Sequence, residues 1–300
     1  MSFLNNIIEF LDSLKIEYQK DASMKKYTSF KIGGNAEVLC VAKNASELSA
    51  LLRYLNERNI KPFILGNGSN LLVSDDGIKG VVIKLEGDFE SINAEGDKIT
   101  VGAGATLNAL CRFALNHELS GLEFAYGIPG TVGGGAYMNA GAYGGQMSDV
   151  TLKVQHLNAD GTEGFYTADE LDFGYRHSAY SNSDKVITFV ELQLNKGNAE
   201  KISDAMNDFW SRRKDKQPLN YPSAGSVFKR PEGYFAGALI EQSGLKGASV
   251  GGAQVSQKHA GFIINKDNAT CQDVLSLIRF CQKTVKEKFG VELECEIKNV

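Results

Sequence analysis

Long runs of apolar residues are absent from this chain of 300 residues. No stretch approaches the roughly 18 consecutive apolar residues that a membrane-spanning helix needs, so the sequence predicts no membrane span. The N-terminal segment MSFLNNIIEFLDSL is amphipathic and carries early acidic residues. It lacks the basic start and the unbroken apolar core of a signal peptide, and we therefore expect a cytoplasmic protein.

An excess of basic residues is also missing, because 32 Lys and Arg residues stand against 36 Asp and Glu residues. The resulting net charge of −4 gives no bulk attraction to nucleic acid or to an anionic membrane. We expect neither as a partner, and any anionic ligand has to be held by local groups. A hydrophobic content of 43% is ordinary for a globular protein and allows one large domain or two to three smaller ones.

Cysteine and histidine patterns typical of a metal site are missing as well. The five cysteines are scattered without a CxxC pair, and the four histidines show no ligand spacing. We expect the cysteines to be reduced, small, buried side chains. The sequence therefore predicts no metal site.

Glycine, in contrast, is concentrated in residues 127–145, GIPGTVGGGAYMNAGAYGG, where eight of nineteen residues are Gly and none is charged. Glycine permits positive φ and close approach of the backbone to a bulky group. A chain that exposes many backbone N–H groups can bind an anion, so the segment predicts a large, phosphate-bearing ligand against main chain. We expect its larger side chains to be shielded from solvent: Ile128, Pro129, Val132, Tyr137, Met138 and Tyr143.

Apolar periodicity predicts the regular elements. The expected helices cover 3–15, 44–59, 107–116, 199–216, 234–243 and 270–288. The expected strands cover 36–41, 62–66, 71–75, 80–85, 90–95, 98–104, 150–161, 162–168, 186–194 and 261–265, with 293–298 as an edge strand.

The order of these elements predicts an α+β fold. Residues 36–65 form a β–α–β unit, whereas the short strands after residue 88 favour an α+β region over a second parallel sheet. Boundaries near 87 and 198 give three domains, 1–87, 88–198 and 199–300.

Two shorter glycine-rich loops have different interpretations. GNGSN (66–70) follows a strand, and its small residues let the backbone approach a phosphate while Ser69 and Asn70 add neutral donors. An ordinary β-turn is the alternative. GAGATL (102–107) lacks the third glycine and the downstream acidic residue of a dinucleotide fingerprint, so we interpret it as a turn that caps a helix. This favours a flavin or nucleotide site of non-Rossmann architecture.

Four polar segments have both a structural and a functional interpretation. Ser226, in PSAGSVFKRP, is either a turn residue or a proton donor, and the absence of G-x-S-x-G excludes a nucleophile elbow. Arg176, in YRHS, is either a surface residue on a turn or a carboxylate clamp. RRKDK (212–216) is either a solvated helix end or a diphosphate clamp, and Glu294 and Glu296 are either a surface pair or part of a site.

Seven motifs occur along the chain: TSFKIGG (28–34), GNGSNLLV (66–73), GIPGTVGG (127–134), MNAGAYGG (138–145), YRHS (175–178), PSAGSVFK (222–229) and GVELECEI (290–297). In this order the chain resembles the UDP-N-acetylenolpyruvoylglucosamine reductases, the MurB family of flavoenzymes in peptidoglycan precursor synthesis. The resemblance extends from about residue 20 to residue 300. The short interval between Arg176 and Ser226 resembles the shorter, second type of these enzymes.

The resemblance implies an FAD-binding module of the vanillyl-alcohol-oxidase type, made of two α/β subdomains, followed by an α+β substrate-binding domain that closes over a UDP-sugar. It implies bound FAD, NADPH as co-substrate and, we expect, a monomer. The implied cofactor-binding residues are Gly66, Asn67, Gly68, Ser69, Asn70, Gly127, Ile128, Pro129, Gly130, Thr131, Gly133, Gly134, Asn139, Ala140 and Gly141. The implied substrate-binding residues are Lys214, Lys216, Gly225, Lys229, Arg230 and His259.

The resemblance also implies three catalytic residues and a two-stage reaction. Hydride passes from NADPH to flavin N5 and then to the vinyl C3 of the enolpyruvyl ether. Arg176 and Glu296 flank the substrate carboxylate, and Ser226 delivers the proton to C2. Lys229 is the expected cation that helps Ser226, and Glu296 is expected to be protonated or bonded indirectly.

The chain departs from the family pattern at two places. Arg230-Pro231 stands where the family often has Asn-Pro, and ECEIK has Cys295 for Pro and Lys298 for Arg. These departures concern the nucleotide side more than the chemistry. Two rival functions stay open from the sequence: a flavin oxidase of the same superfamily acting on another substrate, and a flavin- or nucleotide-binding module without enzymatic activity.

Overall fold

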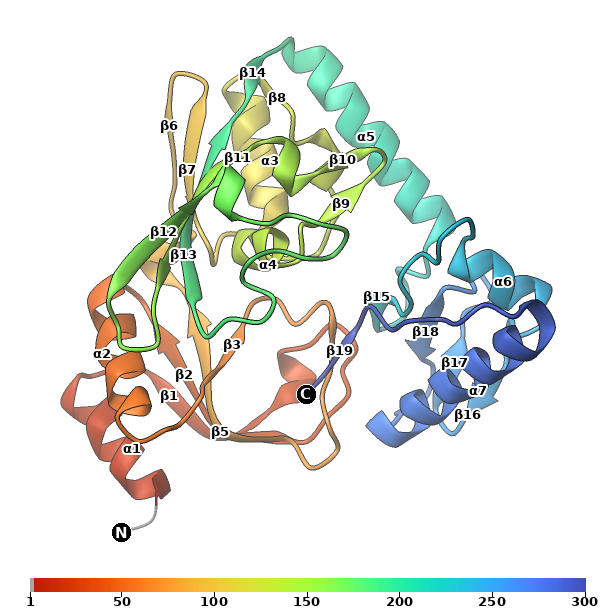
Figure 1. Ribbon diagram of the computed structural model, residues 1–300, viewed down its shortest axis with the longest axis horizontal. Coiled ribbons are helices and arrows are strands. Elements are labelled where there is room, and N and C mark those ends of the chain that lie inside the picture. The colour runs from red at the N-terminus through yellow and green to blue at the C-terminus, as the bar shows by residue number, and fades with distance from the viewer. Residues whose placement is uncertain (1–2) are drawn as a thin grey trace. The chain divides into compact units, whose positions relative to one another are not determined.

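The computed structural model describes residues 3–300, which form two compact units (Figure 1). Unit 1 comprises Met1–Lys20, Val38–Asn67 and Gly80–Arg212. Unit 2 comprises Asp21–Glu37, Gly68–Lys79 and Arg213–Val300. The division into three domains at residues 87 and 198 stays a prediction.

The N-terminal part of the chain builds a four-stranded sheet in the order β1-β2-β5-β3, with β3 parallel to β5. Its elements are α1 (Phe3–Ser13), β1 (Tyr18–Ser23), β2 (Asn35–Ala42), α2 (Ala45–Asn56), β3 (Phe63–Leu65) and β5 (Ile78–Leu85). The Asn44 side chain starts α2 by accepting the Glu47 N–H, and the predicted leucine stripe of α2 is buried. The predicted β–α–β order is confirmed.

A five-stranded antiparallel sheet in the order β12-β11-β13-β7-β6 follows in unit 1. Its strands are β6 (Ile92–Glu95), β7 (Lys98–Gly102), β11 (Thr151–Leu157), β12 (Glu163–Thr167) and β13 (Val186–Gln193). The prediction of an α+β region, in place of a second parallel sheet, is confirmed. The short helix α4 (Val132–Tyr137) packs on β7 and β13 and contacts α3 (Leu107–Asn116). Unit 1 also holds the short pairs β8 (Leu119–Ser120) with β14 (Asn195–Lys196) and β9 (Gly141–Ala142) with β10 (Gly145–Gln146).

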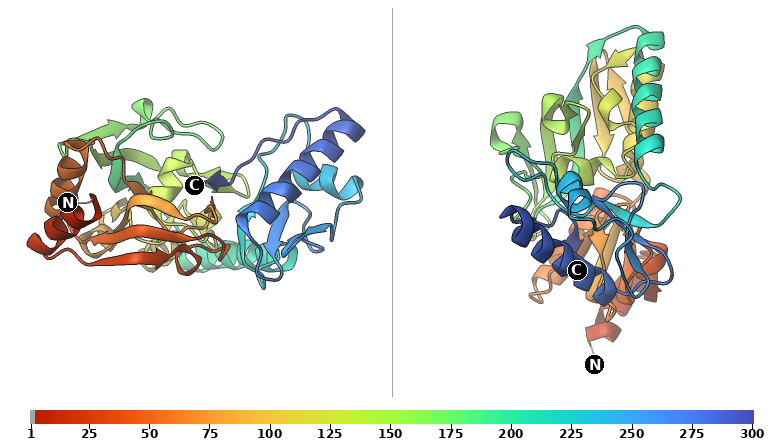
Figure 2. Two further views of the ribbon diagram at one scale, coloured as in Figure 1. Left: turned by 90° about the horizontal axis from the view of Figure 1, so that it is seen from below. Right: turned by 90° about the vertical axis from the view of Figure 1, so that its right-hand side faces the viewer.

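Unit 2 contains an antiparallel sheet in the order β15-β18-β17-β16, on which α7 packs, and α6 contacts α7 (Figure 2). Its elements are β15 (Ser223–Ser226), α6 (Ala236–Gln242), β16 (Ser249–Val250), β17 (Ala253–Val255), β18 (Phe262–Asn265) and α7 (Cys271–Phe289). A capping box of Thr270 and Asp273 starts α7, and Gly290 ends it in the left-handed conformation. The helix α5 covers Ala199–Lys216 as predicted.

Five short 3₁₀ helices complete the regular structure of the described residues: η1 (Met24–Lys26), η2 (Gly87–Glu90), η3 (Glu123–Ala125), η4 (Met147–Asp149) and η5 (Ala168–Glu170).

The predicted edge strand over residues 293–298 is wrong. Cys295 makes one isolated bridge with Phe228, and only Lys298–Asn299 (β19) forms a strand, parallel to β4 (Leu71–Leu72). The reason is that the segment changes its hydrogen-bonding partner along its length. The Glu296 N–H bonds to Val227 O, whereas the Lys298 N–H already bonds to Asn70 O. No single neighbour runs along the segment, so a regular ladder cannot form.

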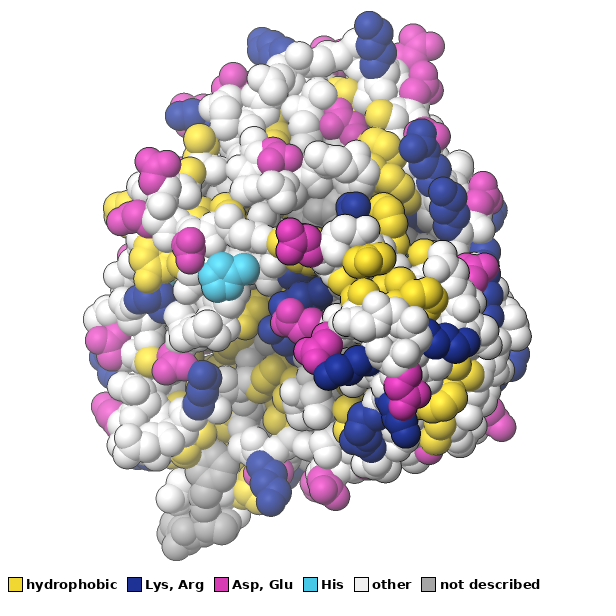
Figure 3. Space-filling model, turned by 45° about the vertical axis from the view of Figure 1, so that its right-hand side comes forward, with side chains coloured by type: hydrophobic (Ala, Val, Ile, Leu, Met, Phe, Trp, Pro, Cys, Tyr) yellow, Lys and Arg dark blue, Asp and Glu magenta, His cyan; other side chains and the backbone are white. Residues whose placement is uncertain are grey.

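Apolar side chains form two buried clusters, one dominated by unit 1 residues and one by unit 2 residues. Four cysteines are buried as expected, and burial raises the pKa of the Cys40 thiol to about 12, but Cys295 is partly exposed. Basic and acidic side chains are interspersed on the face drawn in Figure 3. Among the described helices, none has the length and apolar character to cross a bilayer.

His156 on β11 is a buried polar residue that the sequence did not single out. It pairs with Gly164 on β12, and a Cβ on Gly164 would lie 2.6 Å from His156 Nε2. Its Nδ1 lies 2.8 Å from the Tyr180 hydroxyl, which donates to Val154 O and therefore accepts from Nδ1–H. Burial, assisted by the charge of Lys185, lowers the pKa of His156 to about 4, so the ring is neutral near pH 7.

This histidine should make the protein sensitive to acid. Between its ordinary pKa of 6.5 and about 4, the unfolded chain binds a proton that the folded chain does not. Its contribution to the free energy of unfolding therefore falls as the pH drops, by at most about 1.4 kcal/mol per pH unit. His156→Asn keeps a donor for Tyr180 but does not titrate. Urea denaturation should show the wild-type advantage over this variant shrinking from pH 7 to pH 4.5. An advantage equal at both pH values would contradict the assignment.

Candidate active site

Two glycine-rich loops meet in unit 1. A Cβ on Gly66 would lie 2.7 Å from the Thr131 hydroxyl oxygen, and the Asn67 side chain donates to Pro129 O over 3.2 Å. Only glycine fits at position 66 at this distance without a shift of Thr131. The loop after β3 and the 127–134 segment therefore lie directly against each other.

The 127–134 segment is held from behind by residues 103–107. Backbone hydrogen bonds run from Leu107 to Gly130, from Val132 to Ala105 and from Gly133 to Ala103, at 2.8–3.0 Å. Thr106 caps α3, as predicted for GAGATL, and Thr131 caps α4 by accepting the Gly134 N–H. The loop conformation is thus fixed by the surrounding protein.

The expected shielding of the larger side chains in this segment holds for Val132 but is wrong for two residues. Pro129 is exposed, and Tyr143 is 40% exposed. Tyr143 stacks on Phe209 of α5, with ring centroids 4.6 Å apart and an interplanar angle of 2°. One face of the ring is therefore covered by α5, which residue type alone could not indicate.

In unit 2 the Gly68–Asn70 part of the GNGSN loop packs on Tyr27–Ser29. Gly68 has φ +59°, and a Cβ there would lie 2.2 Å from Tyr27 O, so both conformation and space require glycine. The Ser29 N–H bonds to Gly68 O. Within the described part of the chain, no hydrogen bond uses the backbone N–H of Gly68 or Ser69, so both can meet an anion.

Thr28, in the TSFKIGG motif, is a candidate site residue that the sequence analysis assigned no role. It is 6% exposed, and its hydroxyl has no hydrogen-bond partner among residues 3–300. Leaving a buried hydroxyl unsatisfied costs about 1–3 kcal/mol, so such a group is typical of a site that receives a polar ligand or an ordered water. The Gly68 and Ser69 N–H groups and the Thr28 hydroxyl, all in unit 2, fit a phosphate-bearing ligand.

The chain segments that carry Ser226 and Glu296 are hydrogen-bonded to each other in unit 2. Val227, next to Ser226, accepts the Glu296 N–H over 2.7 Å, and its own N–H bonds to Gly261 O. Asn70 donates from its side chain to Glu296 O over 3.2 Å. Gly225, before Ser226, has φ +78°, and a Cβ there would meet no atom within 4 Å, so the strand has open space beside the serine.

The two C-terminal glutamates differ in their surroundings. Glu294 is 72% exposed at its side chain and pairs with Lys229, whose N–H also bonds to Glu294 O. Glu296 is only partly exposed. The surface interpretation therefore fits Glu294. Its carboxylate engages the ammonium group of Lys229, which was expected to help Ser226.

Arg176 belongs to unit 1, where it lies on a tight turn. Gly174 and His177 close the turn with two backbone hydrogen bonds, and Arg176 has φ +55°. The guanidinium group reaches Gly141 O at 3.5 Å and lies 5.0 Å from the ring centroid of Tyr175. Left-handed backbone costs a non-glycine residue roughly 1–2 kcal/mol, so the turn is held in a strained form by its surroundings.

The expected substrate-side residues lie in different surroundings within unit 2. Lys214 and Lys216 are exposed, and Arg230 stacks over Phe235 at 4.1 Å. The interpretation of 212–216 as a fully solvated helix end is wrong for Arg213, which is 7% exposed. Burial lowers the pKa of His259, and its Nδ1 accepts the Gly261 N–H, so the neutral ring carries its proton on Nε2. No group of three or more His, Cys, Asp or Glu in the described chain could hold a metal ion.

Comparison with known sequences finds two families along the chain. The profile of the UDP-N-acetylenolpyruvoylglucosamine reductase C-terminal domain matches residues 217–300, and that of an FAD binding domain matches residues 36–163. A UDP-N-acetylenolpyruvoylglucosamine reductase of Caldanaerobacter subterraneus is 54% identical over 92% of this chain and 91% of its own. One of Lactiplantibacillus plantarum is 47% identical over 94% and 93%.

Among solved structures, the MurB reductase of Thermus caldophilus superposes with a TM-score of 0.81 at 37% identity, covering 95% of this chain and 98% of its own. A berberine-bridge-enzyme-like protein of Physcomitrella patens has a TM-score of 0.51 at 14% identity, covering 65% of this chain and 45% of its own, and shares the fold alone. The predicted fold class, an FAD-binding module of the vanillyl-alcohol-oxidase type with a C-terminal α+β domain, is confirmed.

The glycine at position 68 gives a direct test of the cofactor loop. Gly68→Ala places a Cβ against Tyr27 O, so we expect most of the FAD to be lost on gel filtration. Gly96→Ala is the matched control, because Gly96 has a similar φ of +66° but open space around it. Visible absorbance per chain measures the outcome. Equal FAD content in both variants would show that close backbone approach at residue 68 is not needed.

Proposed function

Because the chain belongs to the UDP-N-acetylenolpyruvoylglucosamine reductase family, we propose that it reduces UDP-N-acetylglucosamine enolpyruvate to UDP-N-acetylmuramate, with NADPH as the reductant. The chain is an FAD-dependent oxidoreductase of peptidoglycan precursor synthesis. The observation that carries the proposal is the backbone hydrogen bond from the Glu296 N–H to Val227 O, which sets the Ser226 and Glu296 segments side by side in unit 2.

The residues that would hold FAD are those of the glycine loops. Gly66 and Asn67 lie beside Thr131, whereas Gly68 and Ser69 present uncommitted N–H groups suited to a pyrophosphate. The Asn139 side chain is 2% exposed and bonded within the protein, so residues 139–141 would meet the cofactor through their backbone. The chemistry that FAD supplies when bound is to store the hydride from NADPH and deliver it from N5 to vinyl C3.

Arg176 has the chemistry needed where charge develops. Addition of hydride to C3 turns the vinyl group into a methyl group and leaves an electron pair on C2, delocalised into the carboxylate. A preorganised cation stabilises such charge better than solvent does. The planar fork of Arg176 matches a carboxylate in a bidentate manner, and its strained turn fixes the backbone from which the fork extends.

Ser226 completes the reaction by giving its proton to C2, which yields the lactyl ether. A hydroxyl is a weak acid, so the serine has to be replenished with a proton and helped by a neighbouring charge. Lys229 lies three residues after Ser226, but its ammonium group already pairs with the Glu294 carboxylate, which reduces the positive charge available to the serine. Glu296 would support the anionic substrate only if it is protonated or acts through a bridging group.

The nucleotide side of the substrate would be held by basic and neutral donors of unit 2. Lys214, Lys216 and Arg230 are exposed cations suited to a diphosphate, and the neutral Nε2–H of His259 suits a carbonyl or hydroxyl. Residues 199–300 would form this substrate domain, with 1–87 and 88–198 as the cofactor-binding subdomains. A cytoplasmic monomer completes the proposal.

Ser226→Ala tests the assigned proton donor. Reduction of the bound flavin by NADPH should keep its wild-type rate, because no proton to C2 is needed in that half-reaction. Reoxidation by UDP-N-acetylglucosamine enolpyruvate should slow by roughly 10²–10⁴-fold, the range typical of a lost general acid. Stopped-flow absorbance of the flavin measures both rates.

Ser223→Ala is the matched control, because Ser223 lies on the same strand three residues earlier. It should reoxidise at the wild-type rate. A Ser226→Ala enzyme that reoxidises as fast as this control does not use Ser226 as its proton donor.

A further inference from the structure

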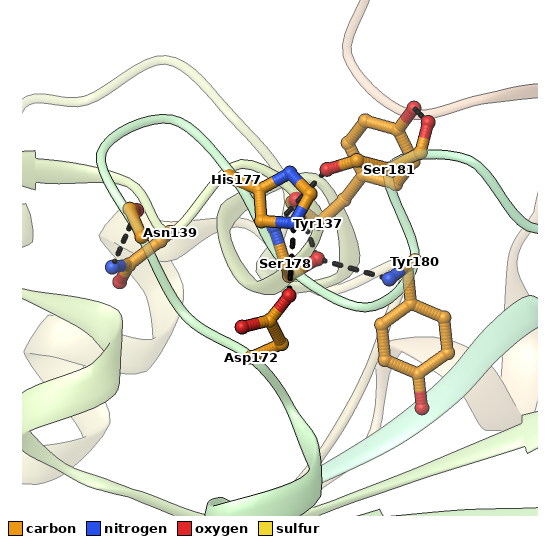
Figure 4. A network of polar contacts seen from close by, with 8 residues as sticks. Tyr137, Asn139, Asp172, His177, Ser178, Tyr180 and Ser181 are labelled. Carbon is orange, nitrogen blue, oxygen red and sulfur yellow. Dashed lines mark hydrogen bonds and ion pairs between the residues drawn. The ribbon is translucent and has the colours of Figure 1, made fainter.

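The strained turn that carries Arg176 is anchored at both ends to the same short segment. The turn spans Gly174–His177, and the segment is residues 137–139 at the end of α4 (Figure 4). Neither anchor comes from a side chain of the turn itself. The position of the Arg176 backbone therefore depends on uncharged side chains that lie outside the turn.

The first anchor is Asn139, which precedes the turn in the sequence. Its Nδ2 donates to Gly174 O over 3.1 Å, and its Oδ1 accepts the Ser148 N–H over 2.9 Å. Asn139 is 2% exposed and has φ +43°, a conformation that asparagine tolerates better than most residues. Its side chain thus links the start of the Arg176 turn to the glycine-rich segment.

The second anchor is Ser178, which follows the turn and is fully buried. Its hydroxyl donates to Tyr137 O over 2.8 Å and accepts the Tyr180 N–H over 3.3 Å. The Tyr137 hydroxyl in turn donates to Ser181 O over 3.0 Å. The chain leaving the turn is therefore fastened to the residue two positions before Asn139.

Buried hydrogen bonds of this kind are the means by which a protein keeps a strained backbone conformation. The guanidinium contact to Gly141 O, at 3.5 Å, is at the outer limit of a hydrogen bond and contributes little to holding the turn. With either anchor removed, the turn can relax toward an ordinary conformation, and the fork of Arg176 starts from a displaced backbone. A misplacement of about 1 Å can cost roughly 10²-fold in rate.

We propose that Asn139 and Ser178 are positioning residues that fix Arg176 for the reduction of the enolpyruvyl substrate. This inference rests on the proposed function. Both side chains act through Arg176. Ser178 lies outside the glycine-rich segments expected to hold FAD, so its substitution should leave flavin content and reduction by NADPH unchanged.

Single variants give the first test. Asn139→Ala and Ser178→Ala should each slow reoxidation of the reduced enzyme by the enolpyruvyl substrate by roughly ten- to hundredfold. The FAD content of Ser178→Ala and its reduction by NADPH should match the wild type, whereas the rates of Asn139→Ala are compared per bound FAD, because residues 139–141 would meet the cofactor. If Asn139→Ala does not fold, Asn139→Asp serves instead, because it keeps the acceptor for Ser148 and loses the donor to Gly174 O.

A double-mutant cycle with Arg176→Ala separates positioning from general damage. Combined with Arg176→Ala, either anchor substitution should change the reoxidation rate less than threefold, since there is no guanidinium group left to misplace. Residues that act independently would instead multiply their effects. Full multiplication in an active enzyme would overturn the inference.

Asp172→Asn is the control on the same turn region. It removes the negative charge that faces His177 Nε2 at 3.3 Å, without touching either anchor, and should leave all rates unchanged. A loss equal to that of Ser178→Ala would overturn the inference, because any disturbance of the turn would then suffice. A wild-type enzyme that is not reoxidised by the substrate would overturn the proposed function and this inference together.

Discussion

The close approach of the Gly66 and Gly68 backbone to neighbouring residues is the physical constraint that orders the glycine-rich loops. A single methyl group at either position would collide with Thr131 or with Tyr27. These contacts tie each loop to a neighbouring segment of its own unit, and they fix the Gly68–Ser69 N–H groups, which make no hydrogen bond among the described residues. A flexible glycine-rich loop would have to lose conformational entropy on binding, whereas these loops are already ordered.

The backbone of the three proposed reacting residues is likewise ordered by neighbouring segments. The turn at Gly174–His177 holds the backbone of Arg176. The hydrogen bond between Glu296 N–H and Val227 O holds the backbone beside Ser226 and at Glu296. Such preorganisation matters for an anionic transition state, because a charge that is already in place needs no rearrangement when the electron pair develops. The departures at Cys295 and Lys298 leave the Val227–Glu296 bond intact.

Local patterns in the sequence predicted the regular elements well. The helices at 107–116 and 199–216 have the predicted bounds because apolar period and caps are local signals. The strand expected at 293–298 failed, because Glu296 and Lys298 bond to different segments far away in sequence. The side chains of Asn139 and Ser178 likewise bond to segments 35 and 41 residues away along the chain, which local patterns do not reveal. Motif resemblance led to the proposed reacting residues, and the structure shows which contacts hold them.

The most direct test of the central claim is anaerobic NADPH oxidation by the purified, FAD-containing protein, with and without UDP-N-acetylglucosamine enolpyruvate. The account predicts one NADPH consumed per enolpyruvate, formation of UDP-N-acetylmuramate, and no sustained oxidation without the substrate. Failure of the enolpyruvyl substrate to support NADPH oxidation in a protein that carries FAD would contradict it.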